Sequence, residues 1–324
     1  TDVSNNTLLG IAWQFNPAQE IIAQTRVSWY SNKGTGSFEG SFVDPSQNSG
    51  EISRADTFGI RLISFGLDYD YIYQKLSIGQ RFLLASDDHT LEAGFGIDRL
   101  RTDFVRYFQL DPVFKQFLLA RGQAIPSDAY LQDRIALGER VFVQPGLRLD
   151  VYPSLRKRVS ISPRLNVSIK LDDLSTLRAA YGHYAQSPGM EKQDFRNRFI
   201  FSEGTLAGLV PEHAHHYVLG YDRMITAEWQ FKTEAYYKSF ADIIEPQKFS
   251  GSAWRVDRTG SDVFRREGWT IPVRVPSDSL TSTPVNAGTG RSYGFELMFQ
   301  KIRSGPDDTF TGWISYALSF ADRE

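Results

Sequence analysis

The sequence contains no cysteine, and this absence removes several kinds of chemistry at once. With 324 residues and no thiol, the chain has no disulfide, no cysteine nucleophile and no cysteine ligand for a metal. It also lacks any run of about 18 apolar residues, the length that marks a membrane-spanning helix. A formal net charge of −2 provides no basic field for nucleic acid. The N-terminal stretch lacks the charged and apolar regions of a signal peptide.

What the sequence does contain is an alternation between short turns and long connections. Short turns are predicted at 16–19, 86–89, 137–139, 172–174, 224–227 and 303–308. Long connections are predicted at 31–56, 107–127, 187–211 and 248–288, with a shorter one at 153–159. Bacterial membrane barrels have short turns at the periplasmic end and long loops at the outer end. The alternation therefore predicts a transmembrane β-barrel.

The predicted strands show a clear two-residue period. From Trp229 onward, Trp229 and Phe231 lie on one face and Lys232 and Glu234 on the other. Such a pattern also fits a soluble β-sandwich. Strand length favours the barrel, because 64–84 and 227–247 are about 20 residues each against a usual five or six. We expect an all-β antiparallel meander of about twelve strands: 7–15, 20–31, 64–85, 90–106, 128–136, 140–152, 160–171, 175–186, 212–225, 227–247, 289–303 and 309–321.

Three places depart from this regular pattern. The phase of the alternation slips between Tyr73 and Leu76, which predicts a β-bulge. Pro145 lies inside a predicted strand and indicates an edge or a bulge there. The loop at 107–127 carries a helix signal, with a capping residue and proline at 111–112 and a glycine stop at Gly122. This helix would pack on its own loop or act as a lid over a ligand.

Five segments resemble the barrel of TonB-dependent outer-membrane receptors: 137–152, 162–189, 211–244, 288–301 and 312–320. The resemblance is strongest from about residue 130 to the end. It implies ligand capture by outer loops, followed by rearrangement of an N-terminal plug domain driven through TonB. The family has a barrel of about 22 strands.

The chain departs from that family pattern in ways that predict an incomplete barrel. Neither a plug domain nor a TonB-binding box is recognisable, and no closing strand with a terminal aromatic residue follows the last predicted strand. We therefore interpret residues 1–324 as part of a receptor barrel that lacks the plug and terminal strands. The edge at 7–15 exposes Leu9, Ile11, Trp13 and Phe15 with little charge to discourage pairing. We expect an open, curved sheet.

The functional prediction is an outer-membrane receptor of a Gram-negative bacterium that imports a scarce ligand with TonB, and not an enzyme. Its expected partners are outer-membrane lipid, the TonB system through the plug, and a siderophore, vitamin, glycan or peptide, but no nucleic acid. A passive channel or an adhesin is the alternative within the membrane class. A soluble β-sheet glycan-binding module is the alternative outside it. Aromatic residues at both strand ends favour the barrel, and examples are Trp29, Tyr181, Trp229 and Tyr237.

Few residues qualify as catalytic or metal-binding candidates, and we predict no catalytic, cofactor or metal site. His213 and His215 would lie on one face of a strand about 7 Å apart, a spacing that suits a shared metal. No carboxylate pair completes such a site, so these residues and His216 are interpreted as a rim segment. The acidic pairs at 172–173 and 307–308 fall in predicted turns, where aspartate bonds the local backbone.

The predicted sidedness separates two sets of residues. The outward set, expected to face lipid, includes Trp229, Phe231, Leu165, Val167, Leu177 and Phe295. The inward set, expected to face the lumen, consists of charged residues that serve ligand passage or plug contact, or that form a purely structural ladder of charges. Its members are Arg148, Asp150, Arg164, Arg178, Lys232, Glu234 and Lys238, with Glu92 and Asp98 on an earlier strand.

Overall fold

The computed structural model describes residues 2–43, 62–110, 114–188, 206–260, 268–302 and 310–323. These residues form a 13-stranded antiparallel sheet. The strands are β1 (Asp2–Ala18), β2 (Ile21–Val43), β3 (Leu62–Ala85), β4 (His89–Leu110), β5 (Phe114–Ala124), β6 (Ser127–Leu137), β7 (Val141–Val151), β8 (Val159–Lys170), β9 (Ser175–Gln186), β10 (Glu212–Met224), β11 (Trp229–Arg255), β12 (Val273–Lys301) and β13 (Gly312–Arg323).

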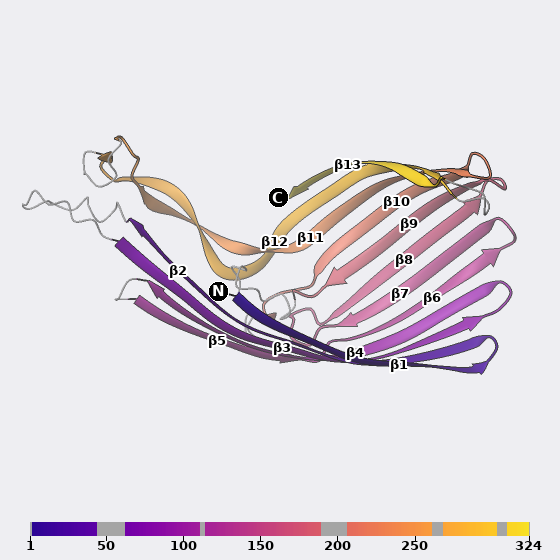
Figure 1. The fold of residues 1–324 in the computed structure, drawn as a ribbon, viewed down its shortest axis with the longest axis horizontal. Helices are drawn as coiled ribbons and strands as arrows, with labels where there is room; N and C mark the ends of the chain where they lie inside the picture. Colours follow the sequence, from indigo (N-terminus) through magenta and orange to yellow (C-terminus); the bar gives the residue numbers. More distant parts are fainter. Residues whose placement is uncertain are drawn as a thin grey trace, which may run out of the picture.

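The sheet is a curved, open trough in which neighbours in sequence are neighbours in space (Figure 1). The strand order runs from β1 to β13 without a crossover, and only β5 lies off this path. The two edge strands, β1 and β13, are not paired with each other in the described part of the chain. The short turns of the described residues gather at one end of the sheet, on the right in Figure 1. The predicted meander and the predicted open sheet are both confirmed.

The predicted helix in the connection after β4 is wrong, because residues 114–124, including Gly122, form strand β5. The predicted cap at 111–112 lies outside the described residues. The first half of β4 pairs with β6, whereas its second half pairs with β5. Between β5 and β6, the carbonyl of Pro126 accepts a hydrogen bond of 2.9 Å from the backbone N–H of Asp98. Strand β5 thus continues the ladder that β6 begins, and it satisfies backbone groups along β4 that a separate helix would leave unpaired.

Two connections predicted to be irregular, 31–56 and 248–288, contain long stretches of strand. Strand β2 continues to Val43, β11 continues to Arg255, and β12 begins at Val273. The predicted long strands are confirmed, since β3 has 24 residues and β11 has 27. The extensions lack the apolar alternation of a membrane strand because polar residues occupy both of their faces. Periodicity therefore does not reveal them.

The β-bulge predicted between Tyr73 and Leu76 is also wrong. Pairing with β2 runs without a shift from Tyr73 opposite Asn32 to Leu76 opposite Trp29. The phase slip in the sequence instead marks a change of face. Toward the turn end, β3 carries its apolar residues on one face, and toward the loop end it carries tyrosines on the other.

Pro145 lies in the interior strand β7, and the register on both sides of it is unshifted. On the β8 side it lies opposite Leu165. On the β6 side, pairing passes from Gln132 directly to Ile135, so the ladder skips two positions beside the proline. Proline has no N–H to donate, and the sheet accommodates it with a short gap in the ladder.

Burial is concentrated under the connections and not between layers. A small core of Leu155, Leu206, Leu209 and Ile244 packs against Tyr152. Tyr69, Leu100 and Phe104 are also buried on β3 and β4. Many other large apolar side chains on the strands are exposed, among them Leu147 at 53% and Leu219 at 54%. No helix in the described residues is long and apolar enough to cross a membrane.

Candidate functional site

The charged residues predicted to act together share one face of the sheet. Directly opposite residues in a ladder lie on the same face, so the register assigns each residue to a face. One row of directly opposite residues crosses four strands and consists of Arg164, Gly182, His216 and Lys238. A second row of directly opposite residues consists of Arg178, Gly220 and Glu234. In the neighbouring strands, Asp222 is opposite Lys232. By alternation along β7, Arg148 and Asp150 belong to this face, which we call the polar face.

Glu92 on β4 is the centre of the tightest polar cluster on this face. Its carboxylate accepts from Nε and Nη2 of Arg81 at 2.8 and 2.9 Å. It also accepts from the Tyr130 hydroxyl at 2.8 Å and from Nε2 of Gln132 at 3.1 Å. The three donors come from β3 and β6, on either side of β4. The cluster therefore ties three strands together through one charge.

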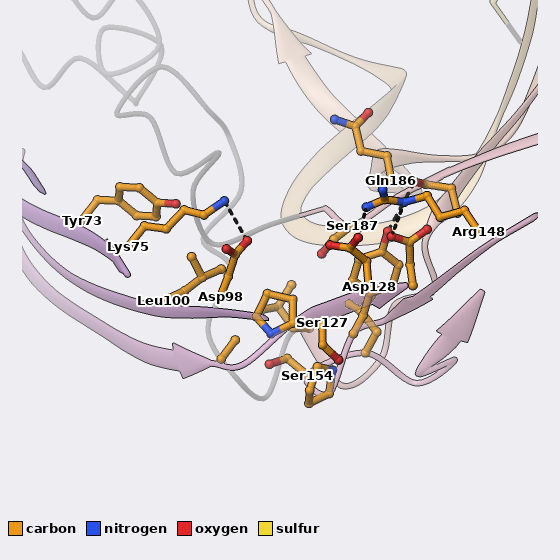
Figure 2. A pocket seen from close by; sticks show the side chains of 18 residues that line it. Tyr73, Lys75, Asp98, Leu100, Ser127, Asp128, Arg148, Ser154, Gln186 and Ser187 are labelled. Atoms are coloured by element: carbon orange, nitrogen blue, oxygen red, sulfur yellow. Dashed lines mark hydrogen bonds and ion pairs between the residues drawn. The ribbon is translucent and has the colours of Figure 1, made fainter. Parts of the chain in front are cut away.

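A second group of charges surrounds a cavity of about 290 Å³ near the loop end. Arg148 donates to Asp150 at 2.9 Å and lies 3.3 Å from Asp128, while Lys75 lies 2.7 Å from Asp98. Figure 2 shows the two ion clusters on opposite sides of the cavity. The remaining lining includes Tyr73, Ser127, Tyr152, Gln186 and Ser187.

The other predicted residues are spread along the polar face toward β10 and β11. Arg178 pairs with Asp222 at 2.8 Å, and Arg178 and Glu234 line a second cavity of about 350 Å³. The Arg164 guanidinium lies over the Tyr184 ring at 4.8 Å, and the Lys238 ammonium lies 4.8 Å from the Tyr236 ring. The seven predicted residues thus share a face but occupy several clusters.

This arrangement can bind and orient a polar molecule. Carboxylates and cations alternate, and aromatic rings stand beside them. No group of three or more histidine, cysteine, aspartate or glutamate side chains in the described ranges could hold a metal ion. Sequence reasoning missed Lys75 and Asp128. The bulge wrongly predicted between Tyr73 and Leu76 left the face on which Lys75 lies unassigned. Asp128 is the second residue of β6, where too few residues precede it to establish an alternation.

The opposite, apolar face carries ordered aromatic contacts. Tyr181 meets Tyr217 at 5.2 Å, Tyr217 meets Tyr237 at 6.4 Å, and Tyr293 meets Phe320 at 5.4 Å between ring centroids. Nearer the turns, Trp229 stacks on Phe299 at 4.7 Å. The register places the predicted outward residues on this face: Leu165, Val167, Leu177, Trp229, Phe231 and Phe295.

His213 and His215 share a face, as their spacing predicted. The register shows that this is the apolar face and that His216 lies on the polar face. A third imidazole, His183, stands between the first two at ring distances of 5.2 and 4.7 Å. Sequence spacing could not find it, because it reaches the others only through the pairing of β9 with β10.

The acidic pair at 172–173 serves the turn between β8 and β9. Asp172 accepts a hydrogen bond of 2.8 Å from the backbone N–H of Leu174 through Oδ1. The same hydrogen bond lowers the pKa of the Asp172 carboxyl below its ordinary value. The pair at 307–308 lies outside the described residues.

An antiparallel trough with one apolar face and one charged face is the arrangement found in the wall of a transmembrane β-barrel. The family described as TonB dependent receptor-like, beta-barrel, matches residues 1–323. The chain belongs to this family. No curated protein sequence matches it.

Solved structures share the fold at low sequence identity. The siderophore receptor PirA from Pseudomonas aeruginosa matches with a TM-score of 0.51 and 13% identity, over 98% of this chain and 55% of that one. The outer membrane transporter YddB from Escherichia coli gives 0.55 and 14%, over 99% and 43%. The ferric-catecholate import receptor Fiu from Escherichia coli gives 0.58 and 11%, over 98% and 47%. The chain spans about half the length of these structures.

Proposed function

We propose that this chain is the partial barrel domain of a TonB-dependent receptor in the outer membrane of a Gram-negative bacterium, with residues 1–324 all belonging to that domain. In the intact receptor, the apolar face contacts lipid and the polar face lines the lumen. The barrel imports a scarce small ligand, such as a siderophore, vitamin, glycan or peptide, and it performs no covalent chemistry. A plug domain of the intact receptor couples the barrel to TonB.

The observation that carries this proposal is the separation of the two faces over the same strands. Along β8 and β9, Val167 lies opposite Ala179 on one face, while Ser168 lies opposite Arg178 on the other. Lipid on one side and water on the other is the environment that this arrangement fits. Family membership supports the same assignment.

The polar face supports ligand passage. The cavity between the Arg148 and Lys75 clusters lies near the loop end, where a ligand from outside would arrive. Its ion pairs are partly exposed, with side-chain exposures of 34% for Arg148 and 36% for Lys75. Charges that are already paired and still reachable can exchange partners with a ligand at little cost.

Cysteine labelling tests the placement, because the chain has no cysteine of its own. Phe249→Cys lies on the β11–β12 hairpin at the loop end, and Asp173→Cys lies in a short turn. An impermeant maleimide added to intact cells should label the first variant and not the second. Permeabilising the outer membrane should expose the second. Equal labelling of both in intact cells would refute the placement.

TonB coupling is tested separately. The intact protein, solubilised from outer membranes, should be retained by the immobilised periplasmic domain of TonB. An unrelated outer-membrane porin serves as the control. Failure of retention, with labelling as expected, would leave a passive channel or adhesin as the better assignment.

A further inference from the structure

The apolar face carries a basic patch just beyond its aromatic row. We call it the rim patch and define it as His183, His213 and His215 together with the loop residues 156–158. His183 lies directly opposite His215, two positions further toward the loop end than the Tyr181–Tyr217 pair. All three histidines lie on the same face as those tyrosines. The patch therefore stands where the lipid-facing surface meets the outer rim.

The position of His183 follows from a break in the sheet. The β8–β9 ladder ends where Arg164 lies opposite Gly182. The next residue of β8 is Pro163, which has no N–H to continue the ladder. The His183 ring bridges the gap instead, because its Nδ1 donates to the carbonyl of Ile161 at 2.9 Å.

These contacts constrain the proton positions in the patch. Nδ1 of His183 donates, so in the neutral imidazole its Nε2 accepts from Nδ1 of His213 at 3.2 Å. The hydroxyl of Tyr181 lies 3.1 Å from Nδ1 of His215, and when this hydroxyl donates, the proton of His215 is on Nε2. In that tautomer the patch offers an N–H donor at His215. It does not offer three converging lone pairs for a metal.

The loop above the histidines adds positive charge. Arg156, Lys157 and Arg158 are consecutive and exposed between β7 and β8. The charge of Lys157 acts on His213, where it is opposed by that of Asp242. A lysine ammonium and an imidazole N–H, with an exposed arginine on each side of the lysine in the chain, form a donor set suited to a phosphate group.

The β8 surface beside the histidines and below them is apolar. Val159, Ile161 and Leu165 on β8 are exposed at 47%, 55% and 41%. Cations above an exposed apolar strip match a molecule with an anionic head and a hydrocarbon tail. We propose that the rim patch binds the phosphate of a phosphorylated lipid in the outer leaflet. This inference rests on the proposed membrane placement.

The test measures binding of dihexanoyl phosphatidic acid to the intact protein in detergent by titration calorimetry. Dihexanoyl phosphatidylcholine and inorganic phosphate are titrated in parallel. The triple variant R156Q/K157Q/R158Q should weaken phosphatidic acid binding about tenfold or more, because each cation near an anionic lipid surface contributes substantially. His215→Ala should weaken it about threefold, the loss of one hydrogen bond. His215→Gln, which keeps an N–H donor, should restore most of it.

A matched control removes three exposed cations elsewhere. The variant K248Q/R255Q/R274Q changes the net charge equally on the projecting β11–β12 hairpin and should bind like wild type. Equal binding of phosphatidylcholine, equal weakening by the control variant, or equally tight binding of inorganic phosphate alone would each overturn the inference. Competition by zinc would also overturn it, in favour of a metal site.

Recovery of the protein in the outer-membrane fraction distinguishes a failure of the lipid inference from a failure of the proposed membrane placement. Protein that is recovered there but does not prefer phosphatidic acid contradicts only the lipid inference. Protein absent from that fraction contradicts the membrane placement, and the inference falls with it.

Discussion

The turn end and the loop end of the sheet follow different rules. Near the turns, β8 and β9 pair without a shift and their apolar and polar residues alternate cleanly. Near the loops, β11 shifts register between Phe240 and Ile243, where Asp242 adopts a φ of 58°. In a bilayer every backbone group needs a partner within the protein, whereas above it water supplies one. Register shifts also occur at the turn end, where β1 and β2 shift between Phe15 and Ala18. It is therefore the alternation of apolar and polar residues that separates the two ends.

The largest expected effect comes from a cation within the lipid-facing part of the apolar face. Val167→Arg should destabilise the intact protein by about 2–4 kcal/mol, the cost of arginine facing the bilayer midplane. Its amount in the outer membrane and its free energy of unfolding from lipid vesicles in guanidinium measure the effect.

Two matched variants sharpen this result. Ser168→Arg places the same side chain on the polar face and should be tolerated. Val273→Arg makes the same exchange at the loop end, where the side chain is 57% exposed, and should also be tolerated. If Val167→Arg were tolerated as well, the apolar face would not face lipid.

A glycine at the loop end gives the next largest effect. A Cβ on Gly36 would clash with Cζ of Tyr69, whose ring covers the glycine. Gly36→Ala must displace that ring, and overpacking of this kind costs about 1–3 kcal/mol. Gly79, nearer the turns, has only a backbone oxygen at 3.8 Å. Gly79→Ala should therefore leave the free energy of unfolding nearly unchanged, and an equal loss in both variants would contradict the packing argument.

The turn end was far more predictable from sequence than the loop end. The alternation from Trp229 onward and the short turns specify strand identity, order and face, because lipid imposes one rule on every alternate residue. The extension of β2, the strand β5 and the unshifted pairing at Tyr73 escaped prediction. Outside the bilayer both faces of a strand can be polar, so periodicity carries little information there.

The sequence predicts which charged residues share the polar face, but not which of them contact one another. Alternation alone placed Arg178 and Glu234 on one face. The polar cluster centred on Glu92, which we call the Glu92 hub, depends on which residues of β3 and β6 lie beside Glu92. The strand register decides this. The rim patch likewise joins His183 to His213 across a strand pair, and no spacing within one strand could reveal it.

Removing the Glu92 hub should have a moderate effect. Glu92→Ala leaves Arg81, Tyr130 and Gln132 without their shared acceptor, at a cost of about 1–3 kcal/mol. Asp322→Ala breaks the more exposed pair with Arg291 and should cost much less, because solvent-exposed ion pairs contribute little to stability. Guanidinium unfolding of both variants would compare them, and a larger loss for Asp322→Ala would refute the role of the hub.

The smallest expected effect is a pH dependence in the turn at Asp172. The hydrogen bond from the Leu174 N–H lowers the pKa of this carboxyl in the folded protein. A depressed carboxyl pKa contributes stability that is present above the unfolded pKa and is lost as the pH falls through the folded pKa. Asp172→Asn keeps an oxygen acceptor but does not titrate. Wild type should therefore lose stability relative to this variant as the pH falls below the ordinary aspartate value of 3.8. Parallel pH profiles of unfolding for the two proteins would show that the turn draws no stability from the charge.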